Sequence, residues 1–323
     1  MSKIRKVVDE TPEDPRALVA YSEFYITNVC NLACTNCNRF NDHDFRGWQR
    51  WSDYAEQYQQ WSKRVKLQKI TILGGEPLLN PTICDWVDGI NQLWNKPVQI
   101  LSNGTRLNQV PDLYDRISKF GQAPKREPRN WIGISLHNEN DRERCFEEIR
   151  KFLRGNITYI HKDDPRNVDN AFTRGGDHAF VDQHDMRICV WEYDSFYRAA
   201  VQKNQHGKFT LFNNDAAQAH QGCGFVMFKC YHFIRAKLYK CGPVALFPEF
   251  DQQHPFDISE EDRILLNSYS ALGVDEFETR GQEFLSHIDD VIPQCKFCPT
   301  SADQRNDKLY AVSKKAGSTR QFE

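Results

Sequence analysis

The sequence lacks the features that mark a membrane or secreted protein. No run of about eighteen apolar residues occurs in its 323 residues, so it contains no candidate transmembrane helix. Its first twenty residues are charged throughout and lack the apolar core of a signal peptide. From these absences we expect a cytoplasmic protein with no membrane partner.

The sequence also lacks a strong net charge. Its 42 Lys and Arg residues are balanced by 44 Asp and Glu residues, which leaves a formal charge of −2. Proteins that bind nucleic acid usually carry a basic surface, so we expect no nucleic-acid partner. The chain is 40% hydrophobic, which is enough for a well-buried core.

Cysteine, by contrast, is abundant. Eleven cysteines in a cytoplasmic chain need a reason, because structural disulfides are rare in that compartment. Most fall in two groups, which are Cys30, Cys34 and Cys37 near the N-terminus and Cys223, Cys230, Cys241, Cys295 and Cys298 near the C-terminus. Such clustering favours metal binding. The isolated Cys84, Cys145 and Cys189 are expected to be small buried hydrophobic residues.

The order of apolar patterns predicts an α/β fold. Strand-like runs at 22–29, 69–73, 98–102, 131–137, 156–160 and 187–193 alternate with helix-like segments at 51–65, 81–94, 109–120 and 141–153. Six strands with crossover helices predict a partial (β/α)6 TIM-like barrel. We therefore divide the chain into an N-terminal extension (1–20), the partial barrel (21–200) and a small cysteine-rich domain (201–323). The polar segment 161–187 is expected to be a loop and a candidate lid.

The first cysteine group, in "CNLACTNC", admits three interpretations. A zinc site needs four ligands, with His43 or a distant thiol as the fourth. A redox site needs only the pair Cys34 and Cys37, which leaves Cys30 unexplained. An iron–sulfur cubane held by three thiolates would keep one iron open for another ligand. The spacing favours the third interpretation but does not exclude zinc.

The ends of the next strands carry residues suited to ligand binding. The strand at 69–73 ends on Gly74-Gly75-Glu76-Pro77, where glycines permit close backbone approach. The strand at 98–102 ends on Ser102 and Asn103, and the strand at 131–137 carries Ser135. Parallel α/β folds bind ligands at the carboxyl edge of the sheet, so these residues should share an edge with the cysteine loop.

Over residues 21–200 the sequence resembles the radical S-adenosylmethionine (radical SAM) enzymes, by the order and spacing of these motifs. The resemblance implies that Cys30, Cys34 and Cys37 hold a [4Fe–4S] cluster whose open iron binds S-adenosylmethionine. It further implies that Gly74–Pro77 contact the methionine group of S-adenosylmethionine. Its ribose and carboxylate would be contacted by Ser102, Asn103 and Ser135. One departure is Asn36, which stands where the family usually has an aromatic residue.

This family cleaves the cofactor with one electron to a 5′-deoxyadenosyl radical, which abstracts hydrogen from unactivated carbon. The electron would come from a flavodoxin- or ferredoxin-type donor. The protein holds the cofactor and the substrate in register.

The second cysteine group could by spacing be a structural zinc site. It also resembles the twitch or SPASM modules that many radical SAM enzymes carry. In that resemblance Cys230, Cys241, Cys295 and Cys298 ligate an auxiliary [4Fe–4S] cluster, and Ala236 replaces the usual glycine of the hairpin. Cys223 has three possible roles: it could replace Cys230 as a ligand, act catalytically as a thiol donor near the substrate, or be simply buried. We expect the last.

A fully ligated auxiliary cluster suits an electron relay, and hence oxidation or dehydrogenation of a small polar substrate. Epimerisation, with Cys223 returning a hydrogen atom, is a further possibility. About twenty residues precede the first strand, too few for a leader-recognition domain, which disfavours the alternative of a peptide-modifying maturase. The competing class is a non-enzymatic zinc-binding interaction protein.

Overall fold

The computed structural model describes residues 14–120, 129–193, 195–196, 199–303, 307–308 and 311–313. Residues 1–13, most of the expected N-terminal extension, lie outside these ranges, and the first strand begins at Ala17, within the expected extension. Among the described residues, none of the helices has the length and apolar character needed to cross a membrane.

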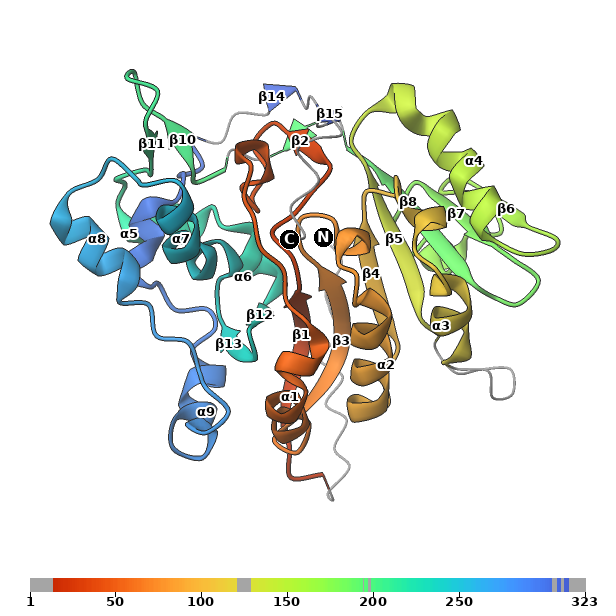
Figure 1. Ribbon diagram of the computed structural model, residues 1–323, viewed down its shortest axis with the longest axis horizontal. Helices are drawn as coiled ribbons and strands as arrows, with labels where there is room; N and C mark the ends of the chain where they lie inside the picture. Colours follow the sequence, from red (N-terminus) through yellow and green to blue (C-terminus); the bar gives the residue numbers. More distant parts are fainter. Residues whose placement is uncertain are drawn as a thin grey trace.

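The fold is built around a mostly parallel sheet (Figure 1). Its strands, in spatial order, are β13 (Lys237–Tyr239), β12 (Cys230–Ile234), β1 (Ala17–Tyr25), β3 (Val65–Leu73), β4 (Val98–Ser102), β5 (Trp131–Leu136), β8 (Arg187–Glu192), β7 (His178–Val181) and β6 (Thr158–His161). Strands β12, β1, β3, β4, β5 and β8 are parallel. The α/β class is therefore confirmed, and the parallel strands fit a TIM-like fold.

The last part of the expected barrel differs from the prediction. The expected strand at 156–160 is β6, but it pairs antiparallel with β7, a strand inside the segment expected to be a loop. Strand β7 in turn pairs antiparallel with β8. Among the described residues no α-helix lies between β6 and β7, so the chain turns back along the sheet edge rather than crossing over the sheet.

Four helices cover one face of the sheet. They are α1 (Ala55–Ser62), α2 (Ile83–Trp94), α3 (Leu113–Lys119) and α4 (Arg142–Phe152), each within a segment predicted as helical. Their apolar sides pack on Ile70, Ile100, Ile134 and other alternate strand residues to form the main core. Because side chains alternate along a strand, the intervening residues lie on the opposite face, which we call the inner face. Inner-face residues used below are Tyr21, Glu23, Lys69, Thr71, Gln99, Trp131, Ser135, Arg187, Cys230 and His232.

The C-terminal part of the chain is joined to the sheet. It contains α5 (Ala216–Gln221), α6 (Gly224–Phe228), α7 (Gly242–Gln253), α8 (Glu260–Asn267) and α9 (Phe277–Ser286), gathered beside β12 and β13 (Figure 1). Strand β12 pairs directly with β1. A second core, in which Phe40 stacks on Phe247 at a centroid distance of 5.7 Å, joins the segment after the first cysteines to α7. Sheet and core thus continue across the boundary that we expected near residue 200.

Short elements complete the fold. The 3-10 helices are η1 (Asn41–His43), η2 (Trp51–Asp53), η3 (Pro77–Leu79), η4 (Leu107–Gln109), η5 (Glu139–Asp141), η6 (Val168–Asn170) and η7 (Pro293–Phe297). Three two-stranded sheets pair β10 (Gln202–Lys203) with β11 (Phe209–Thr210), β14 (Asp307–Lys308) with β9 (Ser195–Phe196), and β15 (Ala311–Ser313) with β2 (Leu32–Cys34).

Candidate functional site

The first cysteine group lies at the carboxyl end of β1. Cys30 and Cys34 are buried and pack with Leu32 in one cluster, and the half-buried Cys37 packs against it. Burial, together with the nearby Asp42, raises the pKa of the Cys37 thiol. A bound metal would offset this, since it lowers the pKa of a coordinating thiol and binds it as thiolate. Three convergent thiols fit the expected cluster.

A tight turn brings these thiols together. The Cys37 backbone N–H donates to the Cys34 carbonyl at 3.1 Å, and between them Asn36 has a left-handed φ of 61°. Asparagine tolerates that conformation better than most residues. Asn36, which departs from the family pattern, therefore suits the backbone of the turn that it occupies. Strand β2, which carries Cys34, pairs antiparallel with β15, which lies near the C-terminus.

The Gly74-Gly75 turn lies against the segment that leads to Cys30. The Gly75 N–H donates to the Thr27 carbonyl at 2.7 Å, and the Glu76 N–H donates to the Val29 carbonyl at 2.8 Å. A Cβ on Gly74 or Gly75 would lie 2.4 Å from one of these two carbonyl oxygens. The paired glycines thus make room for the cysteine loop itself, a close approach that the sequence alone did not reveal.

Glu76 connects the ends of β3 and β4. Its buried carboxylate accepts from Ser102 Oγ at 2.8 Å, from the Asn103 N–H at 2.7 Å and from the Leu78 N–H at 3.0 Å. Burial raises the pKa of Glu76 to about 7, although these donors oppose the shift. Asn103 Nδ2 in turn lies 3.8 Å from Cys30 Sγ. Glu76, Ser102, Asn103 and Cys30 therefore form one connected site.

Two other predicted residues lie nearby. Pro77 is buried and begins η3 directly after Glu76. Ser135 is half-buried near the end of β5, one residue past Ile134, which pairs in register with Ser102. The predicted strand-end residues thus share one edge of the sheet with the cysteine loop.

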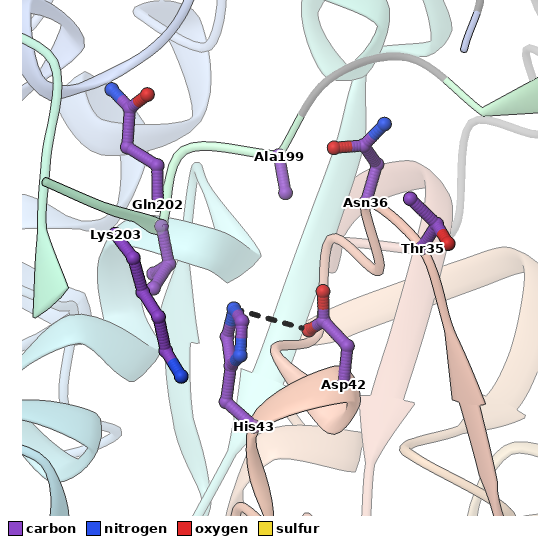
Figure 2. Close-up of a pocket in the computed structure, with 8 residues that line it drawn as sticks. Thr35, Asn36, Asp42, His43, Ala199, Gln202 and Lys203 are labelled. Carbon is purple, nitrogen blue, oxygen red and sulfur yellow. Dashed lines mark ion pairs between the residues drawn. The ribbon is translucent and has the colours of Figure 1, made fainter. Parts of the chain in front are cut away.

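A pocket of about 340 Å³ opens beside this loop (Figure 2). Thr35 and Asn36, which lie between Cys34 and Cys37, line one side of it, and Gln202 and Lys203 of β10 line the other. His43 Nε2 lies 3.5 Å from Asp42 Oδ1, and both residues lie near the base of the view in Figure 2. Sequence reasoning missed the contribution of β10, because two polar residues far along the chain carry no recognisable motif.

The second cysteine group brings Cys223 together with Cys241, Cys295 and Cys298. Burial raises the pKa of the Cys298 thiol, and the charges of the other three raise it further. Burial and the charges of Cys223 and Cys295 raise the pKa of Cys241 to about 12. Four thiols that influence one another in this way fit a four-coordinate site, as either an iron–sulfur cluster or zinc.

Several segments of the C-terminal part assemble this group. Cys223 and Cys241 immediately precede α6 and α7, whereas Cys295 lies in η7 and Cys298 follows it. Asn214 holds the η7 segment, because its N–H donates to the Lys296 carbonyl at 2.9 Å and its Nδ2 donates to the Cys298 carbonyl at 3.0 Å.

Cys230, which we expected among the auxiliary ligands, has Glu23 and His232 as neighbours. It is buried on the inner face, where its thiol lies within 4.8 Å of ligand atoms of Glu23 and His232. Its neighbour Tyr231 packs in the main core, so strand alternation places Cys230 on the inner face, where it pairs in register with Tyr21 of β1. Cys223, by contrast, is one of the charges that act on Cys241, Cys295 and Cys298.

Glu23 is the centre of a buried polar network. Its carboxylate lies 2.7 Å from Arg39 Nη2 and 3.0 Å from His232 Nδ1, and it accepts from Tyr21 Oη at 3.1 Å. Burial alone would raise the pKa of Glu23, but His232 and Arg39 lower it to about 2. A metal ion could in principle use Glu23, Cys230 and His232, but the permanent charge of Arg39 already neutralises this carboxylate.

The network lies between the two cysteine groups. Arg39 follows Cys37 by two residues, and Gly242 follows Cys241 directly. A Cβ on Gly242 would lie 2.4 Å from Arg39 Nη1 and 2.9 Å from His232 Nδ1. The Arg39 guanidinium therefore packs against the backbone that presents Cys241.

The isolated cysteines mostly behave as expected. Cys145 and Cys189 are buried, which confirms the prediction, whereas Cys84 on α2 is only half-buried.

Comparison with known proteins adds an independent finding. Residues 24–163 match the family model of the radical SAM superfamily. A stretch of 122 residues is 31% identical to a protein of Methanocaldococcus jannaschii named "Probable GTP 3',8-cyclase". Both findings support the radical SAM superfamily. The second match covers 31% of this chain and 40% of the relative, so the chain spans less than half of that protein.

The radical SAM segment contains the first cysteine group and the Gly74–Pro77 turn, but not the second cysteine group. The matched superfamily uses S-adenosylmethionine and a [4Fe–4S] cluster as cofactors, so both findings support these two cofactors here. The match to this superfamily and the similarity to a protein named as a cyclase also support an enzyme.

Proposed function

We propose that this protein is a radical SAM enzyme that abstracts hydrogen from a small polar substrate bound against the inner face of the sheet. The observation that carries the proposal is the connected site formed by Cys30, Glu76, Ser102 and Asn103 at the edge of the sheet. A solely structural zinc site gives no reason for a buried carboxylate to join two strand ends beside the thiols.

In this proposal Cys30, Cys34 and Cys37 hold the cluster, and the Gly74–Pro77 turn and the ends of β4 and β5 hold S-adenosylmethionine. Once bound, these cofactors supply the 5′-deoxyadenosyl radical. The chain itself would position the cofactors and exclude water from the cluster site. Cys30 and Cys34 are buried, and Glu76 holds the ends of β3 and β4 together.

We further propose that Cys223, Cys241, Cys295 and Cys298 ligate an auxiliary [4Fe–4S] cluster. A cluster with four protein ligands suits electron acceptance and hence net oxidation of the substrate. If Cys223 is a ligand, it is not a free thiol that could return a hydrogen atom. This favours oxidation or dehydrogenation over epimerisation.

The first experiment tests the radical site. After anaerobic reconstitution we expect about eight irons per chain and reductant-dependent formation of 5′-deoxyadenosine. Replacing Cys30, Cys34 and Cys37 with Ala should remove about half of the iron and all cofactor cleavage. Replacing Cys84 with Ala, on the helix side of the sheet, should change neither. Stoichiometric zinc, with no cleavage after iron loading, would instead support the zinc-binding interaction protein.

The second experiment tests the auxiliary ligands. Cys223→Ala should lower the iron content to about four per chain, whereas Cys230→Ala should leave about eight. The opposite result would restore Cys230 as the ligand and leave Cys223 available as a thiol donor. Deuterium transfer into 5′-deoxyadenosine then screens candidate substrates. These include nucleotides, because the relative is named for GTP, and short peptides, which test the alternative of a peptide-modifying maturase.

A further inference from the structure

Two cations on the inner face come from distant parts of the chain. Lys69 lies on β3, and Arg174 lies in the segment between β6 and β7. Both residues are exposed. Partial desolvation of the ammonium lowers the pKa of Lys69, the Arg174 charge lowers it further, and the charges of Cys230 and Glu23 oppose the shift. Within the described ranges neither residue forms an ion pair with a carboxylate. The Arg174 charge thus acts on Lys69, while neither cation is in ion-pair contact with a described carboxylate.

The fold holds Arg174 in a defined position. Its backbone has a left-handed φ of 52°, which costs energy for a residue other than glycine. Arg187 on β8 anchors this segment, because its Nη1 donates to the Ala171 carbonyl at 2.7 Å. The Arg174 guanidinium lies 4.7 Å from the centroid of the Trp131 ring on β5. The segment between β6 and β7 is thus folded onto the inner face and presents a cation there.

Lys69 is fixed in a similar way. Its ammonium lies 4.2 Å from the centroid of the Tyr21 ring. The nearby carboxylate of Glu23 attracts Lys69 but is already bonded to Arg39 and His232. In the next row of the inner face, Thr71 and its partner in register Gln99 are neutral, and Thr71 Oγ1 donates to Gln99 Oε1 at 3.1 Å.

We propose that Lys69 and Arg174 bind an anionic group of the substrate, a phosphate or a carboxylate, on the inner face of the sheet. This rests on the proposed function and specifies its substrate class. A bound anion would remove the repulsion between the two cations, and the guanidinium offers two parallel donors to either group. The strained backbone of Arg174 is then the cost of presenting its charge to the substrate.

The position of the two cations also constrains the length of the substrate. Lys69 precedes Leu73, the last residue of β3, by four residues. At a rise of about 3.3 Å per residue, its Cα lies about 13 Å from the edge that carries Gly74 and Glu76. The anionic group therefore binds at one end of the substrate, and the carbon that loses hydrogen lies at the other, near the cysteine loop.

The test measures anion binding to the reconstituted protein by anaerobic isothermal titration calorimetry, with inorganic pyrophosphate and citrate as separate probes. Wild-type protein should bind at least one probe, and Lys69→Met and Arg174→Met should each weaken binding about tenfold or more. Arg150→Met is the matched control, since Arg150 lies 5.7 Å from the Phe180 ring on the helix side of the sheet. It should bind as wild type does, and all variants should keep the wild-type melting temperature within a few degrees.

A pyrophosphate-selective result identifies phosphate as the group, and a citrate-selective result identifies carboxylate. Absence of binding to both probes, or equal binding by wild type and both inner-face variants, would overturn the proposal. The same preparations are assayed for 5′-deoxyadenosine. Pyrophosphate binding that depends on Lys69 and Arg174 in a wild-type protein that never cleaves S-adenosylmethionine would overturn the proposed function but support the anion site.

Discussion

The two cysteine groups are built in different ways. Cys30, Cys34 and Cys37 come from one short loop, closed by local hydrogen bonds and braced by the turn after β3. Cys223, Cys241, Cys295 and Cys298 come from segments that are far apart in the sequence, next to α6, next to α7 and around η7. A local group can be read from residue spacing, whereas a group assembled from distant segments depends on packing.

The buried carboxylates Glu76 and Glu23 also differ from each other, both in the groups that hold them and in the direction of their pKa shifts. Glu76, beside the first group, is held by neutral donors from adjacent strand ends, and burial raises its pKa. Glu23, between the groups, is held by Arg39 and His232, and its pKa is lowered. The first carboxylate stabilises one edge of the sheet, and the second joins two parts of the chain through charge. The predictions that follow separate these roles.

The largest effect is expected for Gly75→Ala. The new Cβ would lie 2.4 Å from the Val29 carbonyl oxygen, a backbone atom that Glu76 already fixes. The cysteine loop must move, at a cost of about 3 kcal/mol or more. We expect loss of about half of the iron and all cofactor cleavage, while the second group stays loaded. Iron analysis and denaturant unfolding measure this. Retention of both clusters would show that the close approach is not required.

Arg39→Met should destabilise the protein by about 3–5 kcal/mol, because it leaves the Glu23 carboxylate buried without its permanent counter-charge. Denaturant unfolding measures the change. Arg46→Met is the matched control, since Arg46 pairs with Asp44 at the surface, and should cost less than about 1 kcal/mol. Equal losses in the two variants would mean that the buried network does not join the two parts of the chain.

The raised pKa of Glu76 predicts that the free energy of unfolding depends on pH. Its pKa rises from 4.5 to about 7 on folding, so the folded state holds the proton more tightly than the unfolded state. This contribution to stability is present at low pH and is lost as the pH rises through about 7. We expect the free energy of unfolding to fall by about 2 kcal/mol between pH 5.5 and pH 8 from this group alone.

Because Gln cannot titrate, the free energy of unfolding of Glu76→Gln should lack this decrease between pH 5.5 and pH 8. Denaturant unfolding of both at the two pH values measures it. An identical pH dependence in the variant and the wild type would assign the effect to other groups.

The smallest effect is expected at Gly224, which follows Cys223. A Cβ there would meet nothing within 4 Å. Gly224→Ala should therefore change the free energy of unfolding by no more than about 0.5 kcal/mol and leave the iron content unchanged. It is the matched control for Gly75→Ala, because both glycines lie next to a cysteine group. A loss of auxiliary iron in Gly224→Ala would show that the second cysteine group does not tolerate a Cβ at this position, although nothing lies within 4 Å of it.

Much of the barrel part could be predicted from the sequence. The helix α2 (Ile83–Trp94) lies within the segment predicted from apolar residues at helical spacing, and β3, β4 and β5 fall at or near the predicted runs. Strand β7 (His178–Val181) was missed, because four residues in a polar segment give too short a pattern. Without β7, the antiparallel turn at the sheet edge could not be anticipated.

The sequence by itself determined the first cysteine group and its neighbourhood. Three thiols within eight residues, a Gly-Gly-Glu-Pro turn and polar strand ends are set by local spacing and strand alternation, which hold wherever the strands lie. Only the tertiary structure placed Cys230 beside Glu23 and His232, joined Arg39 to Glu23, and folded the segment of Arg174 onto the inner face. These contacts depend on which faces of distant segments meet, and that is set by packing of the whole chain rather than by any local pattern.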